Sequence, residues 1–301
     1  MAADREHQGQ GLVKATRRRL VPYGLLGPGM AWLFVFFVAP MGFMAYISLN
    51  TGSLEEGFTF TGEWSNYGDA LTDFKEPFVR SFFYAGVATL LALLIAYPLA
   101  YAIAFRGGKW KTALLFIVIA PFFTTYLIRT LAWQTILADQ APIVDFLKTI
   151  GVVAEDGRVL KTSGSVIAGL TYNFLPFMIL PIYASLKQID QRLVEASKDL
   201  YASARTSFLK VTLPLSAPGV VAGTLLTFIP AAGDYINADF LGSQGQAMIG
   251  NVIQGQYLDV KDYPIAAALS FVLTALIMAG VLIYIRFAGS ESLMGEEGKP
   301  T

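Results

Sequence analysis

Long apolar runs alternate with shorter polar segments along this 301-residue chain. A helix needs about 20 residues to cross about 30 Å of hydrocarbon, and six runs are close to that length or exceed it. They cover residues 25–49, 81–105, 112–137, 162–186, 215–233 and 265–285. Because lipid satisfies no backbone hydrogen bond, such runs predict helices. The pattern therefore predicts an all-α integral membrane protein with six transmembrane helices.

Composition supports this class and excludes several others. Hydrophobic residues make up 54% of the chain and charged residues only 15%, against about 25% charged in soluble domains. The chain has no cysteine and a single histidine, His7, so thiolate catalysis, cysteine-bound metals and a helical two-histidine zinc site are excluded. The net charge of zero gives no sign of nucleic-acid binding. An intramembrane protease or metalloenzyme would lack its reacting groups.

The distribution of Lys and Arg predicts the topology. The N-terminal tail, the 106–111 and 187–214 loops and the C-terminal tail together hold 15 of these residues. The other three loops, 50–80, 138–161 and 234–264, hold 6, together with 14 acidic residues. Both termini are therefore expected in the cytoplasm, around one membrane domain. The expected boundaries are a polar tail at 1–24, the membrane domain at 25–286 and a second tail at 287–301. The first apolar run is too long for a signal peptide and predicts an uncleaved helix.

The loop 187–214 carries the most specific pattern. Leu193, Ala196, Leu200 and Ala204 recur at helical spacing on a segment too charged for the bilayer, which indicates docking to a partner. Glu195-Ala196-Ser197, followed by Phe208-Leu209-Lys210-Val211-Thr212-Leu213-Pro214, resembles the signature of permease subunits of binding-protein-dependent ABC importers. Ser197 replaces an alanine of that signature. Tyr201 replaces a glycine that normally lets the chain turn between two short helices.

Further segments extend the resemblance over about residues 20–285. Phe228–Ile236, Met248–Ile253 and Asp262–Ala268 are similar to the spermidine/putrescine branch of the family, most like its first permease. The resemblance implies a type I ABC importer permease (MetI-like) fold, in a bacterial inner membrane, without catalytic activity. It implies that Glu195, Ala196, Asp199, Leu200, Tyr201, Ala204 and Arg205 couple the chain to an ATPase.

The implied partners are two copies of an ABC ATPase subunit, a second related permease, an extracytoplasmic solute-binding protein and membrane lipid. The chain has no P-loop motif, and the resemblance implies that the ATPase subunits bind ATP and Mg while this chain holds no cofactor.

Five residues are candidates for the substrate path, each with a plainer alternative. Arg129 either reaches out to the membrane surface or acts as an ion-pair or pathway residue. Asp234 and Tyr235, close to Asn237 and Asp239, form either a cation-attracting vestibule or simply an acidic outer loop. Tyr172 and Asn173 either line the path or bond between helices. The prolines within the spans, such as Pro121, are either hinges or ordinary bends.

Three functions compete at this point. The first is a permease of a polyamine importer, and the second keeps the fold but imports another small charged organic solute. The third, an ion-coupled secondary transporter, needs ionisable residues deep in several spans. Arg129 alone meets that requirement, which weighs against the third.

Overall fold

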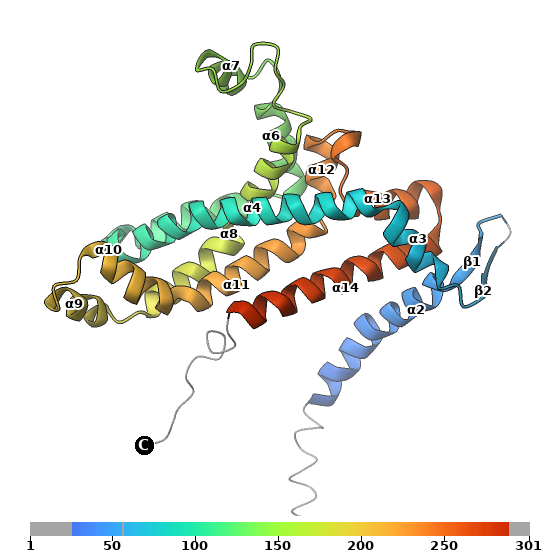
Figure 1. Ribbon diagram of the computed structural model, residues 1–301, viewed down its shortest axis with the longest axis horizontal. Coiled ribbons are helices and arrows are strands. Elements are labelled where there is room, and N and C mark those ends of the chain that lie inside the picture. Colours follow the sequence, from blue (N-terminus) through green and yellow to red (C-terminus); the bar gives the residue numbers. More distant parts are fainter. Residues whose placement is uncertain (1–25, 56, 289–301) are drawn as a thin grey trace, which may run out of the picture.

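The computed structural model describes residues 26–55 and 57–288, and it is mostly helical (Figure 1). Five helical segments are long and apolar enough to cross a membrane: Leu26–Ser48, Lys75–Arg106, Ser163–Gln188, Ala204–Ala232 and Tyr263–Arg286. A sixth span is formed only if the bent pair Gly108–Phe123 and Tyr126–Ile136 is counted as one. The predicted fold class is thus confirmed, with the third span broken. The predicted tail at 1–24 and nearly all of the one at 287–301 lie outside the described residues.

The elements follow one another with short connections. The α-helices and strands are α2 (Ala39–Ser48), β1 (Asn50–Ser53), β2 (Gly57–Phe60), α3 (Ser65–Asp73), α4 (Lys75–Tyr101), α5 (Lys111–Ile119), α6 (Tyr126–Ile136), α7 (Pro142–Thr149), α8 (Ser163–Gln188), α9 (Gln191–Asp199), α10 (Ala204–Ser207), α11 (Leu213–Ala232), α12 (Ile236–Leu241), α13 (Ile249–Gly255) and α14 (Tyr263–Ala288). Turns of π-helix at Phe34–Val38, Ala102–Arg106, Phe208–Thr212 and Gln256–Val260 continue four of these helices.

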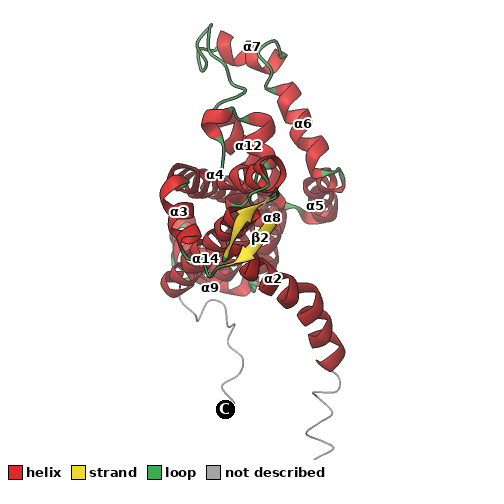
Figure 2. Ribbon diagram, turned by 90° about the vertical axis from the view of Figure 1, so that its right-hand side faces the viewer, coloured by secondary structure: helices red, strands yellow, loops and turns green. Residues whose placement is uncertain are grey.

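The centre of the bundle is the packing of α4, α8 and α11 against one another. Small residues let α8 and α11 approach closely, as is common between membrane helices. A Cβ atom at Gly219 would lie 2.5 Å from the Cβ of Ser185, and one at Gly223 would lie 3.0 Å from the carbonyl oxygen of Met178. Figure 2 shows the long helices end-on, with α2 leaning away from the bundle, and α2 is in contact with α14.

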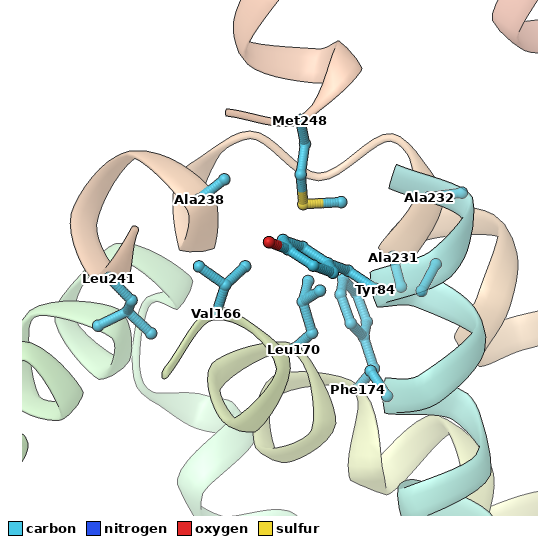
Figure 3. Close-up of a cluster of buried hydrophobic side chains, with 11 residues drawn as sticks. Tyr84, Val166, Leu170, Phe174, Ala231, Ala232, Ala238, Leu241 and Met248 are labelled. Carbon is cyan, nitrogen blue, oxygen red and sulfur yellow. The ribbon is translucent and has the colours of Figure 1, made fainter. Parts of the chain in front are cut away.

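Buried apolar side chains from four separate parts of the chain fill the bundle where α4, α8 and α11 meet the loop after α11. Figure 3 shows Tyr84 lying among Leu170, Phe174 and Met248. The hydroxyl of Tyr84 hydrogen bonds with Ser163 Oγ (2.6 Å), so its one polar atom is satisfied where the ring is buried. This cluster fixes α8 relative to α12 and supports the polar groups on the neighbouring face of α8.

The predicted loops contain more structure than their polarity suggested. The predicted loop 50–80 contains an antiparallel hairpin, with Asn50 paired to Phe60, followed by α3. The hairpin was not predicted from the sequence. The hairpin, α3 and α13 lie at one end of the long helices, and α9 and α10 lie at the other (Figure 1). The predicted loops 50–80 and 187–214 therefore lie at opposite ends of the bundle, whereas α7, in the predicted loop 138–161, lies beyond α6 off the side of the bundle (Figure 1).

The third span is not a single straight helix. It is bent by 94° between Phe123 and Tyr126, where Thr124 and Thr125 have extended backbone angles, with ψ of 140° and 138°. Pro121 lies in the tight turn just before the break, where a proline is well accommodated. α6 therefore turns away from the bundle axis (Figure 1) and carries Arg129 toward α8 and α12. Pro176 and Pro181, by contrast, lie inside the continuous helix α8.

Candidate functional site

The first candidate site is the pair of short helices between α8 and α11. The Asp190 side chain accepts a hydrogen bond from the Arg192 N–H (2.9 Å) and begins α9. Ser203 Oγ accepts from the Thr206 N–H (3.2 Å) and begins α10. Such caps satisfy backbone donors that a helix start leaves free, so local sequence alone favours two short helices here.

All seven residues assigned to ATPase coupling are exposed: Glu195, Ala196, Asp199, Leu200, Tyr201, Ala204 and Arg205. The opposite face of α9 contacts the rest of the chain through the half-buried Val194 and Ser197. Ser197 Oγ hydrogen bonds with Ser207 Oγ (2.6 Å) and joins α9 to α10. Leu200 is 82% exposed and Tyr201 99% exposed. An apolar surface held outward on a rigid hairpin of helices is typical of a docking surface.

Tyr201 takes the backbone conformation that a glycine would take at this position. Its φ of +59° lies in the left-handed region, and its N–H donates to the Lys198 carbonyl (2.9 Å). A non-glycine residue there costs about 1 kcal/mol. The replacement of the family's glycine by tyrosine therefore preserves the turn and adds an exposed aromatic ring at its apex.

The second candidate site is a buried polar network where α6, α8 and α12 meet. Tyr126 Oη donates to Asp234 Oδ2 (2.5 Å), and the Asn237 N–H donates to Asp234 Oδ1 (2.8 Å). Asn237 Nδ2 lies 2.5 Å from Tyr126 Oη and 3.2 Å from Asp234 Oδ1. Asp234 is 9% exposed. Burial raises the pKa of this carboxyl group, and the hydrogen bonds from Tyr126 and Asn237 oppose that rise.

Asn173 extends the network into α8. Its Nδ2 atom donates to Asn237 Oδ1 (3.0 Å) and to Thr130 Oγ1 (3.2 Å), while its Oδ1 atom is buried without a hydrogen-bond partner. Residues 126, 173 and 234 are thus tied together across long stretches of sequence. The same network also begins α12, because Asp234 accepts from the N–H three residues later.

Arg129 is buried rather than extended to the surface. It is 7% exposed, and its Nε atom has no hydrogen-bond partner. Its guanidinium carbon lies 4.9 Å from the ring centre of Phe122 and 5.5 Å from that of Tyr126. Within the described residues, no carboxylate is within ion-pair distance of it. Within the described residues Arg129 is therefore neither extended to the surface nor ion-paired, and its role along the substrate path stays a prediction.

The remaining two path candidates are not part of this network. Tyr172 packs edge-on against Trp133, with ring centres 5.3 Å apart, and lines a cavity on another side of Arg129. The Tyr235 side chain is 41% exposed and lines a separate hollow with Tyr257 and Leu258. Asp234 and Tyr235 are adjacent in sequence, but Asp234 belongs to the buried polar network and Tyr235 lines a separate hollow.

Sequence reasoning did not select Tyr126 and Thr130, which complete the network. Both lie in α6, within a run that reads as a plain membrane span. A signal did exist in the cluster Thr124-Thr125-Tyr126, where polar residues interrupt an apolar segment. Polar groups inside a span usually have a partner or a function.

Several membrane-spanning helices around a buried polar network, with a capped helical hairpin held outward at one end, define a membrane transport component. The profile of the family described as "Binding-protein-dependent transport system inner membrane component" matches residues 88–289. The chain belongs to this family.

Individual relatives agree with this assignment. The chain is 35% identical over 257 residues to the "Spermidine/putrescine transport system permease protein PotB" of Haemophilus influenzae, covering 85% of this chain and 90% of that protein. It is 33% identical over 221 residues to the "Inner membrane ABC transporter permease protein YdcU" of Escherichia coli, covering 69% of each. Among solved structures, a bacterial alginate ABC transporter in complex with a periplasmic protein has a TM-score of 0.69 at 18% identity, covering 93% of this chain and 97% of that chain. The last similarity establishes the fold alone.

Proposed function

We propose that this chain is the permease subunit of an ABC importer for polyamines, and that it forms half of the translocation path. The observation that carries the proposal is the 35% identity to a spermidine/putrescine permease along nearly the whole of both chains. The buried carboxylate of Asp234 and the aromatic side chains near it suit an alkylammonium substrate. The chain itself would be non-catalytic and multi-pass in the inner membrane, with both termini in the cytoplasm.

Four partners follow from this proposal. Two copies of an ABC ATPase would bind ATP and Mg, and one of them would dock on the exposed surface of α9 and α10. A second, related permease would complete the path, and a solute-binding protein would deliver the substrate from outside. The seven exposed residues from Glu195 to Arg205 support the docking step, because this chain leaves that surface uncovered.

An importer for a different small charged solute is the second candidate. One observation favours it, namely the buried guanidinium of Arg129 without a carboxylate partner. Guanidinium groups bind carboxylates and phosphates readily, so an organic anion would suit this position.

One transport assay separates the two candidates. The complete complex is reconstituted in proteoliposomes, and ATP-dependent uptake of labelled putrescine and spermidine is measured. The polyamine proposal expects saturable uptake of both that unlabelled polyamine suppresses and small dicarboxylates do not. Failure of both polyamines, or suppression by the dicarboxylates, would refute the polyamine assignment.

A further inference from the structure

A cavity lies beside the break between α5 and α6. Its volume is about 440 Å³, within the range of small-molecule sites. Residues 122–126 on one side and Asn173, Phe174 and Phe177 on the other line it, together with Arg129 and Pro230. The cavity therefore borders the buried polar network through Tyr126 and Asn173.

Four aromatic rings form a continuous wall of this cavity. Successive ring centres are 5.0 Å apart for Phe122 and Phe177, 6.2 Å for Phe177 and Phe174, and 6.0 Å for Phe174 and Tyr126. We call these four residues the aromatic cage. The negative face of an aromatic ring attracts a cation, and the attraction is strongest where water is excluded.

In this structure a side chain of the protein itself lies in the aromatic cage. The guanidinium of Arg129 lies within 4.9–5.5 Å of the rings of Phe122 and Tyr126. Burying an unpaired charge is costly, and Arg129 keeps a buried Nε donor without an acceptor. Among the described residues, the cation–π contacts with Phe122 and Tyr126 are therefore the interactions that stabilise the buried guanidinium.

Asn173, on the α8 side of the cavity, has a buried acceptor of its own. Asn173 is 1% exposed, lines the cavity and has an unpartnered Oδ1 atom. Buried amide oxygens in native structures are normally hydrogen bonded. Asn173 Oδ1 is closed off from the cavity in this structure, so an ammonium group in the cavity would be held by its charge against the aromatic rings.

We propose that the aromatic cage is a subsite for an alkylammonium group, and that Arg129 occupies it as a displaceable internal cation when no substrate is present. The ligand class is a primary alkylamine in its protonated form. The inference deepens the proposed function but rests on the geometry of the cavity. The subsite would bind such an amine even if polyamines were not the transported solute.

The test measures ligand binding to the assembled transporter in lipid nanodiscs, without the solute-binding protein. The probes are butylamine, which carries the charge, and butanol, its neutral counterpart, each titrated by saturation-transfer NMR. Arg129→Gln removes the competing cation, and we expect butylamine to bind about tenfold more tightly while butanol binding is unchanged. Phe122→Leu removes an aromatic face, and we expect butylamine to bind about five- to tenfold more weakly.

Phe116→Leu is the matched control, because Phe116 is 63% exposed on α5 and does not line the cavity. It should leave both affinities unchanged. The opposite signs of Arg129→Gln and Phe122→Leu distinguish a ligand site from a structural role, which would weaken binding in both variants. If the transporter that carries Arg129→Gln does not assemble, the butylamine affinity of the Phe122→Leu transporter still tests the subsite.

Three results would overturn the subsite. The first is butylamine binding that is unchanged in Phe122→Leu, and the second is butylamine binding that is weaker or unchanged in Arg129→Gln. The third is the absence of butylamine binding both to the unsubstituted transporter and to Arg129→Gln. Failure of putrescine uptake with these butylamine effects intact would overturn the polyamine assignment and leave the subsite standing.

Discussion

The carboxylate of Asp234 has two tasks at once. One oxygen accepts the Asn237 N–H and so begins α12, and the other accepts the Tyr126 hydroxyl, which joins α12 to α6. The first task needs only an acceptor, whereas the second involves a charge-assisted hydrogen bond, which is the stronger kind. Asparagine keeps an oxygen that can accept the Asn237 N–H but removes the negative charge. The substitution therefore tests the role of the charge apart from the role of the acceptor.

We expect Asp234→Asn to retain assembly and to lower the uptake of putrescine. A charge-assisted hydrogen bond contributes about 1.5–3 kcal/mol, so a loss of about ten- to hundredfold is expected at a site only 9% exposed. Uptake into proteoliposomes and co-purification of the partner subunits measure the two effects. Asp239→Asn is the control, since Asp239 is an exposed carboxylate five residues further on, in α12. Equal, small effects of both substitutions would make Asp234 a structural residue of an acidic loop.

Tyr201 allows a test of backbone strain at a single position. With φ at +59°, Tyr201→Gly should stabilise the turn between α9 and α10 by about 1 kcal/mol, in part offset by the added freedom of the unfolded chain. Slower amide exchange in α9 and unchanged transport are the expected results. Loss of coupling in Tyr201→Gly would instead mean that the exposed ring itself binds the ATPase.

At the scale of elements, the long helices followed directly from hydrophobic length, and α9 from the helical spacing of its apolar residues. The break in the third span did not, because Thr124 and Thr125 are compatible with both helix and extended backbone, and only packing decides. The network at Asp234 was also beyond reach. Its members Tyr126 and Asp234 are 108 residues apart, and no local pattern joins a tyrosine in one span to a carboxylate after another. The family resemblance supplied the role of α9, which spacing alone left as an unpartnered helix.

The exposed face of α9 leads to a prediction about coupling. A carboxylate introduced at Ala196 would be buried and unpaired in a docked interface, which costs a few kcal/mol. We expect Ala196→Asp to abolish transport and the substrate-stimulated hydrolysis of ATP, while the chain still inserts into the membrane. Glu195→Lys should lower both activities in the same way. ATPase activity and uptake are measured on the same reconstituted complex.

Gln191→Asp is the matched control for this element. Residue 191 is exposed on the first turn of α9, where an acidic residue is favourable, and it lies outside the seven docking residues. Gln191→Asp should transport normally. Normal assembly and transport in Ala196→Asp would place the ATPase contact elsewhere on the chain.

At the scale of the whole molecule, the distribution of charges predicts an orientation across the membrane. α9 and α10 lie at one end of the bundle and the β1–β2 hairpin at the other (Figure 1). The loops predicted to share the side of α9 hold 15 Lys and Arg residues against 6 on the opposite side. The positive-inside rule therefore predicts that α9 lies in the cytoplasm, which is also the side where the proposed ATPase partner would have access to ATP.

The absence of cysteine makes this orientation directly testable, because any introduced thiol is the only one in the chain. We expect Glu55→Cys and Glu155→Cys, both at exposed positions, to react with a membrane-impermeant maleimide in cells whose outer membrane alone is permeabilised. Tyr201→Cys and Thr301→Cys should react only after the inner membrane is opened. Each variant is labelled under both conditions, so an unreactive thiol is told apart from a shielded one. Labelling of Tyr201→Cys before the inner membrane is opened would reverse the topology, and it would also remove α9 from the ATPase, because a docking helix outside the cell has no nucleotide-driven partner.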